Sequence, residues 1–210
     1  MLNFTIIVGQ TEYDVIEDLN CYVKKYSIGG AEPILNYVEV PYRSIPLDMT
    51  EAVGDGVFYK NRTLTFPMRA KDNPVITHKN IENLFSGRVC KIKVQDDPYY
   101  YSGRVKVGAL GTENSAWDFD FTMIADPYTY KDMNVAFSSP DTTTITNNGI
   151  PVIPTVTTSG AITMAVNEGS AVSLTAGTYK DARFRLVSGE NTIVTTGDSN
   201  VTLIYREMVL

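Results

Sequence analysis

The stretches CKIKVQ (residues 90–95) and WDFDFTM (residues 117–123) decide the fold class of this 210-residue chain. Apolar and polar residues alternate in both. The first stretch sets Cys90, Ile92 and Val94 against Lys91, Lys93 and Gln95. The second sets Trp117, Phe119, Phe121 and Met123 against Asp118, Asp120 and Thr122. Because successive side chains of a β-strand point to opposite faces, both stretches predict strands with one buried and one wet face.

The same two-residue period extends over much of the chain. Leu2, Phe4, Ile6 and Val8 form one such apolar face, and Ile34, Asn36, Val38 and Val40 form another. The segment THKNIENLFSGR (residues 77–88) is the one stretch with a helical pattern, with Thr77 as its N-cap and Gly87 as a left-handed C-terminal cap. We therefore predict an all-β fold with one short helix.

A change of composition near residue 132 predicts two domains, residues 1–132 and residues 133–210. The second segment holds 14 threonines between residues 142 and 202, and turn signals such as Asn147-Asn148-Gly149, Ser188-Gly189 and Thr196-Gly197-Asp198 recur along it. This rhythm is typical of a β-sandwich. Pro151 and Pro154 cannot donate ladder hydrogen bonds, so the strand at IPVIPTV is expected to be an edge strand or to begin late.

Charge and cysteine content limit the classes of partner. The net charge of −6 and the absence of a Lys/Arg cluster argue against nucleic acid. The amino terminus lacks the cationic and apolar regions of a signal peptide, and no apolar run is long enough to span a membrane. Cys21 and Cys90, in no ligand-like spacing, are expected to remain reduced.

The residue types that catalysis requires are sparse. The sole histidine, His78, is expected to lie on the surface at the start of the helix, and the chain has no GxSxG elbow, metal-ligand spacing or phosphate-binding glycine loop. The pair Asp96-Asp97 before Pro98 is typical of a turn, and Asp118 and Asp120 face solvent. We predict a non-enzymatic protein with no cofactor and no metal site.

Tyrosines gather in the first domain, which holds eleven of the thirteen and the single Trp117. Amphipathic rings at this density are typical of subunit contacts, although they could equally be core and edge residues. The second domain has few aromatic residues to serve as a platform for sugars.

Two further stretches carry a resemblance to a known family. VEVPYRSIPLDMTEAVGDGVFYKNRTLTFPM (residues 38–68) and IENLFSGRVCKIKVQDDPYYYSGRVKV (residues 81–107) resemble the amino-terminal domain of phage distal tail proteins, and ADPYTYKD (residues 125–132) is similar to the end of that domain. Tyr42 and Ser44-Ile45 depart from the family's glycines. The motif residues are Asp97, Tyr100, Tyr101, Gly103, Arg104, Pro127 and Tyr128. Residues 145–157 and 186–207 resemble the family's smaller, galectin-like sandwich.

The resemblance implies a structural virion protein at the phage tail tip, made in the bacterial cytoplasm. Such a protein forms a homohexameric ring between the tail tube protein and the baseplate, fibre or receptor-binding proteins. The polar excursion Arg43–Gly56 is a candidate arm that clasps the next subunit, with Arg43, Leu47, Asp48, Tyr59 and Arg62 as its candidate contact residues. Two alternatives stay open: a carbohydrate-binding module for the host cell wall, and another tail or tailocin subunit.

Overall fold

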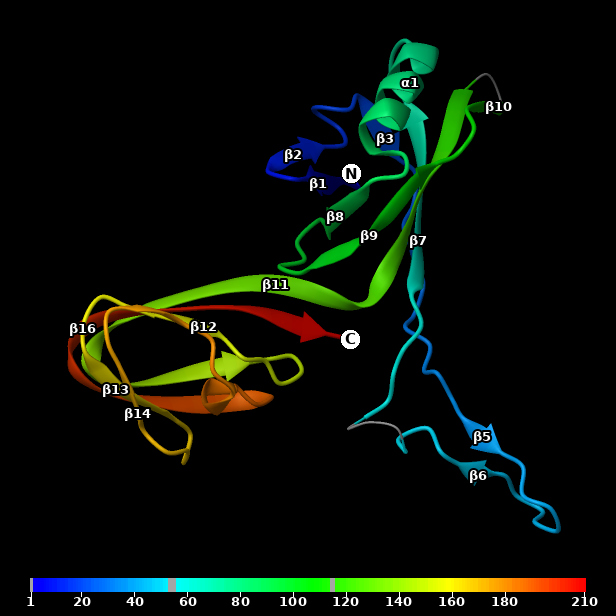
Figure 1. The fold of residues 1–210 in the computed structure, drawn as a ribbon. Helices are drawn as coiled ribbons and strands as arrows, with labels where there is room; N and C mark the ends of the chain where they lie inside the picture. Colours follow the sequence, from blue (N-terminus) through cyan, green and yellow to red (C-terminus); the bar gives the residue numbers. More distant parts are fainter. Residues whose placement is uncertain (1, 53–55, 114–115) are drawn as a thin grey trace. The chain divides into compact units, whose positions relative to one another are not determined.

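The computed structural model describes residues 2–52, 56–113 and 116–210, which form two compact units divided between Thr129 and Tyr130. Each unit has its own buried core. β11 (Ala116–Asn147) continues across the division. The described residues are built from strands with one α-helix (Figure 1), so the predicted all-β class with one short helix is confirmed.

Unit 1, up to Thr129, is one mainly antiparallel sheet with its strands in the order β2-β1-β8-β9-β11-β7. β3 and β4 pair with the other edge of β7, and β10 pairs with β11. The strands are β1 (Phe4–Val8), β2 (Thr11–Asp14), β3 (Cys21–Val23), β4 (Ser27–Ile28), β7 (Arg62–Ala70), β8 (Val89–Val94), β9 (Tyr100–Val107) and β10 (Gly111–Glu113).

The core of unit 1 follows from the alternation along these strands. The register of β7 on β11 places Phe66 opposite Phe121, and both side chains are fully buried. Phe4 on β1 stacks on Phe66 with ring centroids 4.3 Å apart. Burial of such aromatic side chains gives about 1.5–3 kcal/mol each, so this cluster holds the strands together. Cys21 and Cys90 are both free and buried, and burial raises their pKa to about 12 and about 11.

Trp117 differs from the prediction that it shares the buried face of Phe119. Its side chain is 39% exposed, whereas that of Phe119 is 4% exposed. Trp117 lies near the beginning of β11, opposite Thr112 of the short strand β10, where the core already ends. The alternation of apolar and polar residues therefore continues for one apolar residue beyond the buried core.

Helix α1 (Pro74–Phe85) begins earlier than the predicted residues 77–88. Its N-cap is Asn73 in a left-handed conformation, followed by Pro74 in the first turn, while the Thr77 hydroxyl donates to the Asp72 carbonyl over 2.9 Å. Pro is suited to this position because its missing N–H has no helical partner there. Gly87 has φ +78, as expected for a left-handed C-terminal cap.

His78 lies within the helix and is half-buried rather than on the surface. Its Nε2 is 2.8 Å from the Gly108 carbonyl, and its ring meets Phe119 edge to face at 5.1 Å. No helix in the described part of the chain is long and apolar enough to cross a membrane.

Residues 34–40 do not form the half-buried strand that their alternation predicts. They belong to an exposed hairpin whose ladder consists of β5 (Tyr37–Val38) and β6 (Leu47–Asp48). Figure 1 shows this small two-stranded sheet apart from the strands of the main sheet. Of the predicted arm Arg43–Gly56, residues 53–55 lie outside the described residues.

Unit 2, Tyr130–Leu210, is a sandwich in which the long strand β16 (Gly189–Val209) takes part in two sheets. β16 pairs with β13 (Ile162–Val166) through Ile193–Thr196 and with β12 (Thr155–Thr158) through Val201–Ile204. β14 (Val172–Leu174) extends the first sheet and β15 (Gly177–Tyr179) the second, and a short 3-10 helix covers Ala182–Phe184. As expected, the strand at IPVIPTV begins late, at Thr155.

The predicted turn at Thr196-Gly197-Asp198 is instead the corner of β16 between its two pairing partners. Gly197 has φ +103, and a Cβ there would lie 2.5 Å from the Ala161 carbonyl oxygen. Strands that pass between the sheets of a sandwich bend at such points, and glycine permits the bend.

Candidate interaction surface

An uninterrupted run of exposed residues, 32–48, contains the hairpin. Tyr42 at its turn has φ +65 and is fully exposed, and Ile45 is 71% exposed. The large hydrophobic side chains exposed along this segment and its return are Ile34, Leu35, Tyr37, Val38, Val40, Tyr42, Ile45, Leu47 and Phe58. Monomeric soluble proteins rarely expose contiguous apolar patches of this kind, which mark interaction sites.

Local hydrogen bonds fix the shape of the hairpin without a core. The Asp48 carboxylate accepts from the Thr50 backbone N–H over 2.9 Å, and the Thr50 hydroxyl accepts from the Asn36 N–H over 3.1 Å. The hydrogen bond from the Thr50 hydroxyl is the main cause that lowers the pKa of Asp48. The two strands are thus held at a defined register while their apolar side chains remain in solvent.

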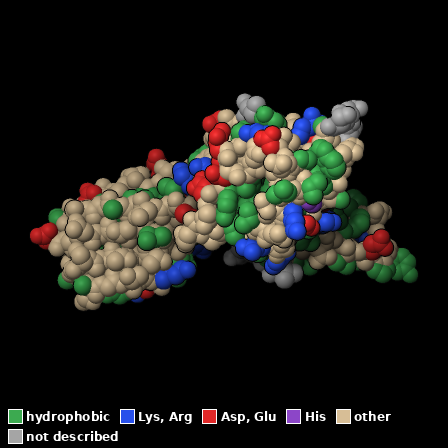
Figure 2. All heavy atoms as spheres, turned by 90° about the horizontal axis from the view of Figure 1, so that it is seen from above, with side chains coloured by type: hydrophobic (Ala, Val, Ile, Leu, Met, Phe, Trp, Pro, Cys, Tyr) green, Lys and Arg blue, Asp and Glu red, His purple; other side chains and the backbone are tan. Residues whose placement is uncertain are grey.

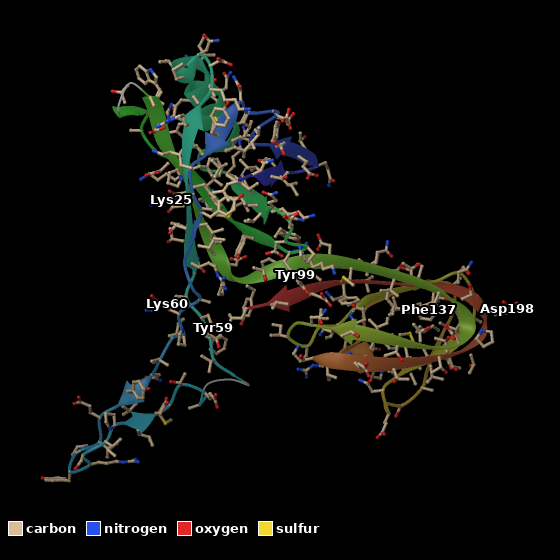
Figure 3. The ribbon with its side chains drawn as sticks, turned by 180° about the vertical axis from the view of Figure 1, so that it is seen from behind. Lys25, Tyr59, Lys60, Tyr99, Phe137 and Asp198 are labelled. Carbon is tan, nitrogen blue, oxygen red and sulfur yellow. The ribbon has the colours of Figure 1, made fainter. Side chains whose placement is uncertain are left out.

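Backbone bonds continue the hairpin toward the main sheet. Pro33 and Tyr59 form a β-bridge, the Ile34 N–H donates to Phe58 over 2.7 Å, and the Lys60 N–H donates to Glu32 over 2.8 Å. Figure 3 shows Tyr59 and Lys60 on the segment that returns to β7. This ladder makes the base of the hairpin an ordered pair of strands.

Several of the predicted residues meet where the hairpin joins β7. Arg62 is 8% exposed; its guanidinium donates to the Pro127 carbonyl and lies 5.7 Å from the ring centroid of Tyr101. Tyr59 and Tyr128 meet edge to face with centroids 6.4 Å apart. Burial is the main cause that raises the pKa of Tyr101. We call these five residues the hairpin root; they come from β7 and its approach, β9 and β11.

The packing around residue 103 explains why the YYSGR motif has a glycine there. A Cβ at this position would lie 2.2 Å from the Ile124 carbonyl oxygen and 2.5 Å from the Ala125 Cα. Backbone atoms cannot yield as a flexible side chain can, so β9 and β11 approach this closely only because residue 103 has no side chain.

The remaining motif residues stabilise β8 and β9. Arg104 donates to the Gly87 carbonyl at the end of α1. The Asp97 carboxylate accepts from the Tyr99 N–H over 2.9 Å within the turn between the strands, as Asp is suited to do. Tyr100 is buried under the Lys91 ammonium, 4.3 Å from its ring centroid. Arg43, Leu47 and Asp48 lie on the hairpin instead, so the predicted set divides between hairpin, root and the β8–β9 pair.

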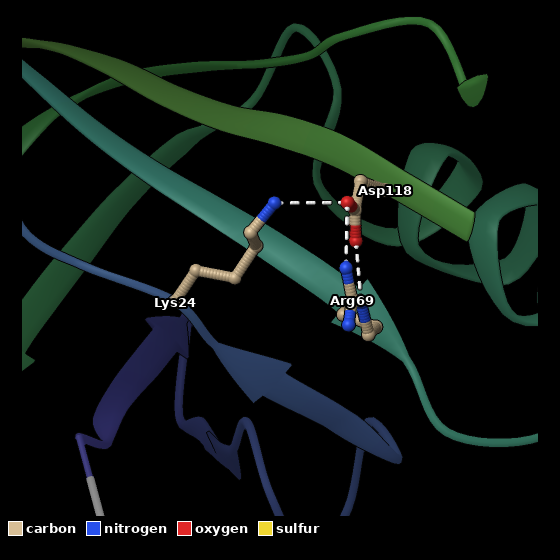
Figure 4. Close-up of polar contacts among 3 residues, drawn as sticks. All are labelled: Lys24, Arg69 and Asp118. Atoms are coloured by element: carbon tan, nitrogen blue, oxygen red, sulfur yellow. Dashed lines mark hydrogen bonds and ion pairs between the residues drawn. The ribbon is translucent and has the colours of Figure 1, made fainter. Parts of the chain in front are cut away.

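Asp118 has a role that the sequence did not indicate. Figure 4 shows its carboxylate between Lys24, at 2.9 Å, and Arg69, at 2.8 Å. The hydrogen bond from Arg69 is the leading cause that lowers its pKa to about 2, and Lys24 adds to it. Its partners lie 94 and 49 residues away, so no local pattern could identify them.

The two units differ in their surface chemistry. Figure 2 shows hydrophobic and charged side chains interspersed over unit 1, whereas few charged side chains are seen on the visible face of unit 2. Among the described residues there is no group of three or more His, Cys, Asp or Glu side chains that could hold a metal ion.

No protein-family model and no curated protein matches this sequence. Solved structures do match. The crystal structure of SPP1 Dit (gp 19.1), described as a paradigm of the hub adsorption apparatus in phages that infect Gram-positive bacteria, is similar with a TM-score of 0.64 and 14% identity. The match covers 97% of this chain and 98% of that one.

A chain of the phage P2 baseplate in its activated conformation with Ca is also similar, with a TM-score of 0.51 and 7% identity. That match covers 97% of this chain and 98% of the other. At such identities the likeness concerns the fold, and it extends over both units. The resemblance found in residues 38–132 is thereby confirmed for the fold: the chain has the fold of a phage distal tail (Dit) protein over nearly its whole length.

Proposed function

We propose that the chain is a structural subunit of a phage tail tip, and that six copies form a ring joining the tail tube protein to the baseplate or adsorption proteins. The full-length fold likeness to SPP1 Dit supports a tail or baseplate role. The observation that carries the ring is the hairpin, an ordered element whose apolar side chains are exposed.

In a ring, the neighbouring subunit can cover the exposed apolar side chains of this hairpin. When one surface of a subunit contacts a different surface of its neighbour, the contact either closes on rotation or continues as a filament. A stable interface buries about 800 Å² on each partner. Nine exposed large hydrophobic side chains on one hairpin are a suitable core for such an interface.

The hairpin root supports the same function. Arg62 and Tyr101 are buried, and the Tyr59–Tyr128 pair adds a second aromatic contact across the junction. A hairpin that binds a neighbouring subunit loses less conformational entropy on binding when its base is already ordered. Unit 2, with its mostly uncharged surface, is proposed to act as a spacer or docking surface for tail-tip or fibre proteins, and the protein as a component of the virion.

Multi-angle light scattering of the purified chain tests the proposal. Six copies of the 23.2 kDa chain give about 139 kDa. The expected result is that mass for the chain alone, or that mass plus the mass of the bound proteins when its tail proteins are co-produced. A particle that stays at 23.2 kDa in both preparations contradicts the proposal.

A further inference from the structure

The outer face of β8 and β9 is positively charged. These strands carry four cations and no carboxylate: Lys91, Lys93, Arg104 and Lys106. They alternate with core residues such as Ile92 and Val105, which lie on the opposite face. The register pairs Val89 with Arg104 and Lys91 with Ser102, so the cations share one side of the sheet.

Two apolar side chains accompany these cations. Val89, opposite Arg104, is 57% exposed, and Ile124, whose backbone abuts Gly103, is 58% exposed. Arg104 is held in place by the Gly87 carbonyl, and Lys91 by the Tyr100 ring. We call Val89, Lys93, Arg104, Lys106 and Ile124 the basic face. It combines exposed apolar area with positive charge. On the same side of β11, the Asp118 carboxylate is already paired with Lys24 and Arg69, and Asp120 is exposed.

The hairpin has the complementary character. Between residues 32 and 52 it carries four carboxylates and one cation, a net charge of −3, which is half of the −6 of the whole chain. The charged residues, all exposed, are Glu32, Glu39, Arg43, Asp48 and Glu51. They flank the exposed apolar side chains described above.

We propose that the acidic, apolar hairpin of one copy docks on the basic face of β8, β9 and β11 of the next copy. The inference rests on the proposed ring and names the acceptor surface within it. Complementary potentials orient two surfaces during encounter and suppress wrong pairings, while the apolar residues supply the buried centre. The contact joins two different surfaces, as a closed ring requires.

Two charge-swapped variants test the docking. The sheet variant is Lys93→Glu/Lys106→Glu, and the hairpin variant is Glu39→Lys/Glu51→Lys; all four side chains are exposed. The sheet variant lowers the charge of β8 and β9 from +4 to 0, and the hairpin variant changes that of residues 32–52 from −3 to +1. Each variant alone therefore loses the charge complementarity, and we expect its association, measured by light scattering, to weaken by about tenfold or more. A matched control, Lys79→Glu/Lys180→Glu, changes two exposed cations that belong to neither the basic face nor the hairpin, one on α1 and one in unit 2, and should assemble like the wild type.

An equal mixture of the two variants gives the sharpest result. In an alternating ring, the acidic hairpin of the sheet variant meets the unchanged basic face of the hairpin variant. The altered hairpin, with a charge of +1, meets the face that carries Lys93→Glu and Lys106→Glu, where the two new carboxylates lie. Six positions allow complete alternation. We therefore expect the mixture to recover the wild-type mass. Recovery would also show that both variants are folded.

The outcomes separate this inference from the ring itself. A wild-type ring together with variants that assemble normally contradicts the docking and leaves the ring standing. Variants that keep the wild-type melting curve but do not recover in the mixture also contradict it. A wild-type chain that stays monomeric contradicts the ring and the docking together.

If the variants fail to fold, a salt titration of the wild type is the test. Its assembly should weaken severalfold between about 50 mM and 500 mM salt, and assembly insensitive to salt overturns the inference.

Discussion

At the scale of single residues, steric fit and charge pairing set the geometry of unit 1. Gly103 lets β9 approach β11, and within the hairpin root Arg62 of β7 donates to the Pro127 carbonyl of β11. Asp118 joins β11 to Arg69 of β7 and to Lys24 beyond β3. Each of these contacts connects parts of the chain that are distant in sequence.

Replacing Gly103 should be costly although the change is a single methyl group. In Gly103→Ala the new Cβ meets the Ile124 carbonyl oxygen and the Ala125 Cα, so the two strands must separate. We expect the free energy of unfolding to fall by about 3 kcal/mol or more in urea titration. Gly111→Ala, with nothing within 4 Å of its Cβ, is the matched control and should remain near the wild type. Equal stability of both variants would contradict the described packing.

The Asp118 cluster predicts a pH-dependent contribution to stability. Its folded pKa of about 2 is lower than the value of about 4 for an unfolded Asp, so the contribution is complete above about pH 4 and is lost as the pH falls through about 2. Lys24 and Arg69 are about 40% exposed, so solvent screening limits the effect to about 1 kcal/mol at pH 7.

Asp118→Asn measures this contribution. The difference in unfolding free energy from the wild type should be present at pH 7 and vanish below about pH 2. Asp120→Asn, on the same face of β11, serves as the control and should change stability by less than about 0.5 kcal/mol. A difference for Asp118→Asn that is independent of pH would refute the ionic explanation.

At the scale of elements, periodicity predicted the strands of the core but not the hairpin, whose arm at Arg43–Gly56 was expected only from the family resemblance. The alternation at CKIKVQ and WDFDFTM predicted β8 and β11, because burial of one face imposes that period. Ile34, Val38 and Val40 show the same period but lie in solvent. The alternation shows that a segment has one apolar face. It does not show whether other residues of the same chain bury that face.

The residue at which α1 begins and the ion-pair partners of Asp118 could not be predicted from the local sequence, for other reasons. The helix begins with Asn73 in a left-handed conformation, which is rare for a residue other than glycine. The ion pairs of Asp118 depend on the register of β3, β7 and β11, which tertiary packing sets. The hairpin-root residues were chosen through a family resemblance, and their convergence required the fold.

Removing the hairpin should separate stability from assembly. None of the residues that the structure describes in this segment belongs to the core of unit 1, so replacing residues 36–56 by a short Gly-Ser linker should change the unfolding free energy by no more than about 1 kcal/mol. By contrast, Phe66→Ala should cost about 3–5 kcal/mol. The shortened chain should be monomeric in light scattering. A shortened chain that still assembles would show that the hairpin is not the principal contact.

At the scale of the whole molecule, the two units have separate cores, and we expect them to fold independently. One core centres on Phe4, Phe66 and Phe121, and the other on Met164, Phe184 and Leu203. Residues 1–129 and 130–210, produced separately, should each show a cooperative thermal transition and a strand-rich circular dichroism spectrum. If either fragment lacks a transition, the two cores depend on each other.

The account's central claim is that the chain assembles into a six-membered ring through its exposed hairpin. Negative-stain electron microscopy of the purified protein, alone and with its tail proteins co-produced, tests this most directly. The predicted result is class averages with six-fold rings for the wild type and none for the hairpin-shortened chain. Isolated particles without rings in both wild-type preparations, or rings formed without the hairpin, would contradict it.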